Sequence, residues 1–133
     1  AHDVALVVLF ETGLQHHGSQ HQALRDCLAF PFLQACPAAW EESRLLQGFP
    51  GEYVLMARRS GNDWFVGGIT VEDRAFQVPL DFLSPDQAFA YTLYQDGETR
   101  ESIEVNSGQC QSSDTLTIPA ARDGGFALHI RGL

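Results

Sequence analysis

A few side chains of this sequence are of the types that do acid–base or metal chemistry. Glu11 follows an apolar run at residues 4–10, and a carboxyl group buried there would have a raised pKa and could donate a proton. A surface carboxylate at the end of a helix is the more common arrangement, so we favour a structural role. His16, His17 and His21 are spaced so that two of them could share a metal ion. No third ligand follows at suitable spacing, so we expect no metal site in this chain.

An aromatic residue and two acids are adjacent at Trp40, Glu41 and Glu42, and Arg44 follows. An aromatic face with flanking acids is one way in which proteins hold a pyranose ring. Tyr94 lies in a second aromatic stretch, and we take Trp40, Glu41 and Tyr94 as the candidate substrate-binding residues. Strand aromatics are more often core or cross-strand pairs, and that alternative stays open for these candidates. It applies equally to Trp64, Phe65 and Tyr91.

The three cysteines, Cys27, Cys36 and Cys110, are not spaced with histidines as in a zinc finger. A disulfide between Cys27 and Cys36 in an oxidising compartment fits their spacing. Three small buried thiols fit it equally well. The sequence leaves both states open.

The 133-residue chain carries a formal net charge of -9, with 8 basic and 17 acidic residues. This balance leaves no basic stripe to neutralise a phosphate backbone, so we exclude nucleic acid as a partner. The apolar run at residues 4–10 is too short to cross a bilayer and lacks the charged start and cleavage site of a signal peptide. We therefore expect neither a membrane partner nor an export signal within this chain.

The elements that would position these residues begin with a helical part. The first 20 residues could form a buried strand or a helix, because their Val and Leu run is apolar nearly all round. Residues 20–34 have helical spacing, with Ser19 as the N-cap. Pro31 lacks an amide proton and crowds the preceding turn, so we predict a break there and a second helical turn at residues 32–35. We place a domain boundary near residues 37–43.

The next stretch, residues 50–70, has two apolar runs at residues 53–56 and 64–69 with a short polar loop between them. Gly61 and Asn62 in this loop tolerate the positive φ that tight strand reversals need. The stretch is therefore predicted to form a β-hairpin.

Two adjacent arginines, Arg58 and Arg59, lie near the end of this hairpin. We predict that one of them pairs with Glu52 or Asp63 across the strands. Such a pair would be structural.

Beyond residue 43 the hydrophobic pattern has a period of two, as at Phe76, Val78 and Leu80. Pro79 in this run suggests an edge strand, and residues 106–114 are predicted to form a loop. Counting the hairpin, the runs give about eight strands. The sequence predicts a mainly β fold, an antiparallel β-sandwich of about eight strands preceded by a short helical segment.

Several short motifs occur in one combination between residues 40 and 70. Trp40 and Glu41 precede Arg44 and a pair of leucines, PGEYV follows at residues 50–54, Ala-Arg-Arg at 57–59 and Trp-Phe-Val-Gly at 64–67. This combination resembles the junction and C-terminal domain of glycoside hydrolase family 97. The resemblance continues through LDFL, YTLYQDG and GGFALHI. Residues 1–15 resemble the last helix and following strand of the family's catalytic (β/α)8 barrel, whereas residues 15–32 depart from the family pattern.

By this resemblance, residues 1–38 are the end of a barrel and residues 39–133 a C-terminal β-sandwich domain. It implies a helix that ends near Glu11 and a short strand at residues 14–16. The family's catalytic carboxylates and calcium-binding glutamates lie upstream of the matching region, so we assign no catalytic residue, no metal ligand and no cofactor to this chain.

The resemblance also implies a function. The chain would be a non-catalytic portion that buttresses the barrel of an enzyme hydrolysing α-glucosides or α-galactosides, usually with calcium. That barrel would be its partner, and the location would be periplasmic or secreted. Two alternatives stay open: a carbohydrate-binding module that uses exposed aromatics, and a structural domain that forms homo-oligomers through an uncovered apolar surface. The sequence does not decide whether the chain alone is an enzyme.

Overall fold

The computed structural model describes residues 1–10, 27–99 and 102–133. In this part the chain forms helices α1 (His2–Leu9) and α3 (Phe30–Ala35) and eight strands, which confirms a mainly β fold with a short helical segment before it. The strands are β1 (Glu42–Phe49), β2 (Tyr53–Ser60), β3 (Asp63–Thr70), β4 (Arg74–Pro79), β5 (Phe89–Asp96), β6 (Ile103–Cys110), β7 (Thr115–Ala120) and β8 (Gly125–Gly132).

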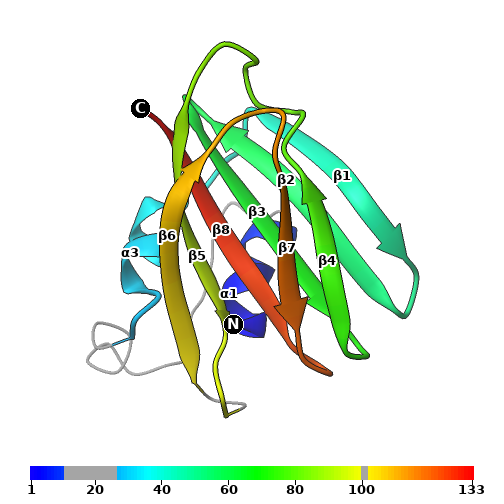
Figure 1. Ribbon diagram of the computed structural model, residues 1–133. Coiled ribbons are helices and arrows are strands. Elements are labelled where there is room, and N and C mark those ends of the chain that lie inside the picture. The colour runs from blue at the N-terminus through cyan, green and yellow to red at the C-terminus, as the bar shows by residue number, and fades with distance from the viewer. Residues whose placement is uncertain (11–26, 100–101) are drawn as a thin grey trace.

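The strands form two antiparallel sheets of unequal size. The large sheet has the order β1-β2-β3-β8-β5-β6, and among the described strands β4 pairs only with β7. Figure 1 shows the β4–β7 pair in front of the large sheet and α1 behind it. The large sheet is therefore covered by strands on one face and by helices on the other.

Strand β3 shows how the sequence fills both layers. Trp64 and Val66 belong to the core between the two sheets, and Phe65 belongs to the core between the large sheet and the helices. Because successive side chains of a strand point to opposite faces, a strand that is covered twice is apolar at nearly every position. The sequence DWFVGGIT has this character.

Glycine lets α1 lie directly on β3. An added Cβ at Gly67 would lie 2.9 Å from the carbonyl oxygen of Ala5 and 3.0 Å from the Cβ of Val8. Val4, Ala5, Val7 and Val8 of α1 are all buried. The first segment is thus a helix, as the family resemblance implied, and its apolar side chains are buried on more than one side of the helix.

The predicted hairpin is β2 and β3, which pair from Tyr53 with Thr70 to Ser60 with Asp63. The turn is two residues long, and Gly61 has a φ of +60°, as a type II′ turn requires at its first central position. The hairpin prediction is confirmed.

The second helical turn, predicted at residues 32–35, begins two residues earlier than expected. Helix α3 begins at Phe30 and carries Pro31 in its first turn, where the missing amide proton costs no hydrogen bond. The predicted strand at residues 14–16 and the first part of the predicted helix lie outside the described residues.

Strand β6 is longer than its sequence suggested. It runs to Cys110, so much of the loop predicted at residues 106–114 is strand. Most of its side chains are exposed because it lies at the edge of the sheet, and an edge strand with polar residues has no alternating apolar signal. The edge position inferred from Pro79 is confirmed, since β4 has a partner on one side only.

Candidate functional site

The candidate residue Trp40 precedes β1 and packs against the large sheet. Its ring meets Phe65 edge-on, with the ring centroids 5.3 Å apart and an interplanar angle of 65°. The guanidinium of Arg58 lies 5.9 Å from its ring centroid, and Arg58 is itself 4% exposed. Trp40 therefore joins the end of α3 to the sheet, and it is only partly buried.

The acids beside Trp40 belong to an ion network at the start of β1. Glu41 accepts hydrogen bonds from the backbone amide of Gly61 at 3.0 Å and from Nη1 of Arg59 at 2.9 Å. Glu42 accepts from Arg44 at 2.6 Å and from Arg59 at 3.3 Å. The amide of Gly61, and after it Arg59, holds the pKa of Glu41 below its ordinary value. This network fastens the β2–β3 turn to the start of β1.

The predicted partners of the hairpin arginines are wrong. Arg59 pairs with Glu41 and Glu42, while Asp63 lies 2.9 Å from Nε2 of His129. The reason is register: Glu42 lies directly opposite Arg59 on β1, and this pairing of strands could not be read from the hairpin alone.

The third candidate, Tyr94, lies in the core between the helices and the sheet. It is 4% exposed, and its ring meets Phe32 of α3 with the centroids 5.3 Å apart. Burial raises the pKa of its hydroxyl. The structure brings Trp40 and Tyr94 into one apolar cluster and leaves Glu41 outside it. Sugar binding by these three residues stays a prediction, and each of them has a packing or pairing role.

Sequence analysis missed the pair formed by His129 and Asp63. The imidazole of His129 stacks on the ring of Phe65, with the centroids 4.4 Å apart and the planes 11° from parallel, and Phe32 meets it edge-on at 6.5 Å. The alternation of β8 places His129 on the helix-covered face, but no local signal identifies a partner 66 residues away in sequence.

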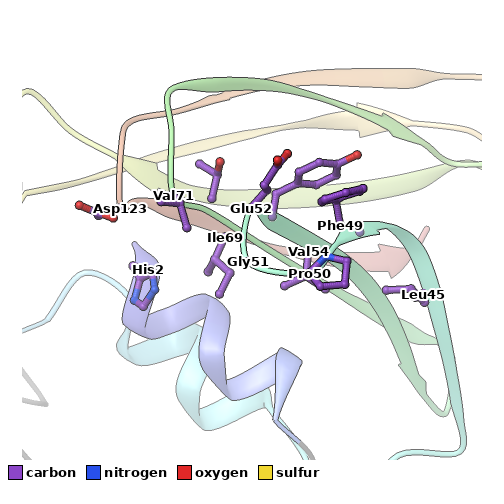
Figure 2. A pocket seen from close by; sticks show the side chains of 13 residues that line it. His2, Leu45, Phe49, Pro50, Gly51, Glu52, Val54, Ile69, Val71 and Asp123 are labelled. Carbon is purple, nitrogen blue, oxygen red and sulfur yellow. The ribbon is translucent and has the colours of Figure 1, made fainter.

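A pocket of about 470 Å³ lies between the N-terminus of α1, the β1–β2 turn and the end of β3. Its lining is largely apolar and includes Leu45, Phe49, Val54, Ile69 and Val71. Figure 2 shows His2 and Asp123 at one end of the pocket and Leu45 at the other. Leu45 is 65% exposed and Phe49 57% exposed, so the lining is open to solvent.

The described residues offer neither a metal cluster nor a disulfide. In residues 1–10, 27–99 and 102–133, no group of three or more His, Cys, Asp or Glu side chains could hold a metal ion. Cys27, Cys36 and Cys110 are free thiols. Glu11, His16, His17 and His21 lie outside the described residues. No helix of the described part is long and apolar enough to span a membrane.

Comparison with known proteins places this fold in a larger context. Residues 39–131 match the family model described as glycosyl-hydrolase 97 C-terminal, oligomerisation. The chain is 39% identical over 130 residues to a probable retaining alpha-galactosidase of Streptomyces bingchenggensis. This alignment covers 96% of this chain and 20% of that protein. It is 33% identical over 134 residues to a retaining alpha-galactosidase of Bacteroides thetaiotaomicron, again with 96% and 20% covered.

A solved structure agrees with these relatives. A glycoside hydrolase family 97 enzyme from a Pseudoalteromonas species superposes with a TM-score of 0.92 at 30% identity, over 100% of this chain and 22% of that one. The chain therefore spans about one fifth of the relatives that it matches.

Proposed function

This chain belongs to the family of glycosyl-hydrolase 97 C-terminal domains, and we propose that it buttresses the catalytic portion of a longer glycoside hydrolase without taking part in the reaction. The observation that carries the proposal is the extent of the match. Nearly the whole chain aligns with two retaining alpha-galactosidases, yet it accounts for only 20% of each. The remaining four fifths of such an enzyme would contain the catalytic barrel that the family resemblance implies.

The chemistry of the described acids supports this role. Glycoside hydrolysis requires two carboxyl groups that face each other across the scissile bond. Here Glu41 and Glu42 are bound to arginines, and Asp63 is bound to His129. These carboxylates hold a turn and neighbouring strands together, which is a structural task.

The parent reaction that we propose is hydrolysis of α-galactosides, with α-glucosides as the second substrate class. Calcium, which the resemblance implies, takes six to eight oxygen ligands. The described residues do not fit this ion, because they contain no group of three possible ligands. We therefore propose that calcium binds in the catalytic portion. The family resemblance, and not the metal chemistry, leads us to propose a periplasmic or secreted parent enzyme.

The test separates a structural from a substrate-binding role in the longer enzyme. Glu41→Gln and Tyr94→Phe should leave kcat and KM for an aryl α-galactoside within about twofold of the parent values and lower the Tm. A tenfold rise in KM at unchanged Tm would instead identify these residues as sugar ligands and overturn the proposal.

Self-association is a second candidate, because the matching family is described by the word oligomerisation. Edge strands β1 and β6 are available for it at the two ends of the large sheet. Light scattering on the eluting peak of a size-exclusion column would measure the mass. A concentration-independent monomer would exclude self-association through this chain.

A further inference from the structure

Within residues 1–10, 27–99 and 102–133, one end of the large sheet lacks the cover that the rest of its helix-side face has. Strands lie about 4.8 Å apart and packed helices about 10 Å apart, so one helix covers about two strands. Helix α1 packs mainly on β3 and β8, with a smaller contact to β2. Phe32 of α3 packs on Phe65 and Tyr94, which belong to β3 and β5. The face of β1 and the outer part of β2 lies beyond both described helices.

This uncovered face is apolar, and we call it the β1–β2 patch. Val54 lies opposite Gly48 on one side and Ile69 on the other. Ile69 is two residues from Gly67, which faces α1, so these positions share the face on which α1 lies. The patch consists of Leu45, Val54, Ile69 and Val71, all of which line the pocket of about 470 Å³.

The exposure of the patch is unusual for its residue types. Leu45 is 65% exposed and Val71 44%. Contiguous apolar side chains at this exposure mark a binding surface more often than a free one. Figure 2 shows Val71 near His2, where α1 begins, and Leu45 at the other end of the pocket.

We propose that the β1–β2 patch docks an amphipathic helix of the catalytic portion, which lies alongside α1 and completes the helical layer. This inference rests on the proposed function. The relatives have about four fifths of their length outside the match, and the matching family is C-terminal, so a covering segment would come from the preceding chain. The helix would present apolar residues to Leu45 and Val54.

Two other occupants fit less well. A second copy that faced this patch would bring Glu52 and Asp123 of both copies close together, and these like charges repel each other. A sugar needs several convergent hydrogen-bonding groups, whereas the side chains of the patch are all aliphatic. The exposed carboxylates of Glu52 and Asp123 at the pocket would pair with Lys or Arg on the flank of a docked helix.

The experiment compares thiol labelling of one position in two proteins. Leu45→Cys is introduced into this chain alone and into the longer protein that carries it, and maleimide labelling is followed by peptide mass spectrometry. Ala75→Cys is the matched control, because Ala75 is an exposed position of β4 in the small sheet. Val71→Cys, which is also exposed in the patch, is a second probe in case the first variant folds poorly.

The proposal expects Leu45→Cys to label at least about tenfold more slowly in the longer protein than in the chain alone, while Ala75→Cys labels at the same rate in both. Equal rates for Leu45→Cys would overturn it. If Leu45→Cys in the chain alone labels more slowly as the protein concentration rises, the patch binds a second copy of the chain, and the docking proposal is overturned as well.

Turnover of an aryl α-galactoside by the unsubstituted longer protein is measured alongside. If the longer protein hydrolyses the substrate but Leu45→Cys labels at equal rates in both proteins, only the docking proposal is refuted. If the longer protein does not hydrolyse the substrate, the proposed function is refuted.

Discussion

Replacing Gly67 by alanine tests whether α1 is an integral layer of this fold. The new Cβ would lie 2.9 Å from the carbonyl oxygen of Ala5, which is backbone, and 3.0 Å from the Cβ of Val8. Neither atom is the end of a flexible side chain, so α1 must move off β3. Overpacking of this kind costs about 1–3 kcal/mol. The contact between helix and sheet sets this cost, so the measurement reports directly on their packing.

Gly48→Ala on β1 is the matched control. Its Cβ would meet its nearest neighbour, Cδ1 of Leu45, at 3.6 Å, an ordinary contact. Both variants gain the lower chain entropy of alanine in the unfolded state, so that contribution cancels between them. We expect Gly67→Ala to be less stable than Gly48→Ala by about 1–3 kcal/mol, or roughly 3–10 °C in Tm for a chain of this size.

The assay is urea and thermal unfolding of both variants, followed by circular dichroism and by tryptophan fluorescence. Coincident transitions are required before free energies are compared. If Gly67→Ala were as stable as Gly48→Ala, the close packing of α1 on β3 would be refuted, and with it the helical layer to which the β1–β2 patch belongs.

Three further outcomes follow from single side chains. Phe32→Ala should lower the free energy of unfolding by about 3–5 kcal/mol in urea, because Phe32 is fully buried; a loss below about 1 kcal/mol would contradict its packing between α3 and the sheet. The pKa of Glu41 is held below its ordinary value by the amide of Gly61 and by Arg59. A carboxyl group whose pKa is lower in the folded state than in the unfolded state stabilises the fold at pH values above its unfolded-state pKa of about 4.3. This stabilisation is lost as the pH falls through the folded-state pKa. The stability difference between the parent and Glu41→Gln should therefore be constant above about pH 5 and shrink in more acid urea titrations, and a difference that grows with acid would refute this reasoning. Burial raises the pKa of Cys36 to about 12, so iodoacetamide at pH 8 should alkylate it far more slowly in the native protein than in urea, as measured by mass spectrometry, and equal rates would contradict its burial.

The strands could be predicted because their signal is local. Alternating apolar residues and a glycine at the β2–β3 turn identified the hairpin, and Gly61 takes the positive φ that was expected there. The helix at residues 2–9 was ambiguous from periodicity alone, because a segment buried on several sides has no polar face. The family resemblance decided it in favour of a helix.

The pairing of distant groups could not be predicted from the sequence. Arg59 was expected to pair within its own hairpin, but Glu41 and Glu42 reach it from β1. Asp63 is bound to His129 on β8 instead. Such contacts depend on the order β1-β2-β3-β8 in the large sheet, and strand order is not encoded in the pattern of any single strand.

The candidate site could also be predicted only in part from the sequence. Residue types identified Trp40, Glu41 and Tyr94 as possible sugar ligands, but type alone does not distinguish an exposed aromatic from a core one. The structure buries Tyr94 against Phe32. The β1–β2 patch had no sequence signal, since its residues come from β1, β2, β3 and the residue after β3 and look like ordinary core residues.

The most direct test of the account is the turnover of an aryl α-galactoside by the purified chain alone, with calcium present. A C-terminal portion that supports a catalytic barrel should show no turnover above that of a mock purification at any chain concentration. Turnover that scales with the concentration of the chain and survives two further chromatographic steps would contradict the non-catalytic role.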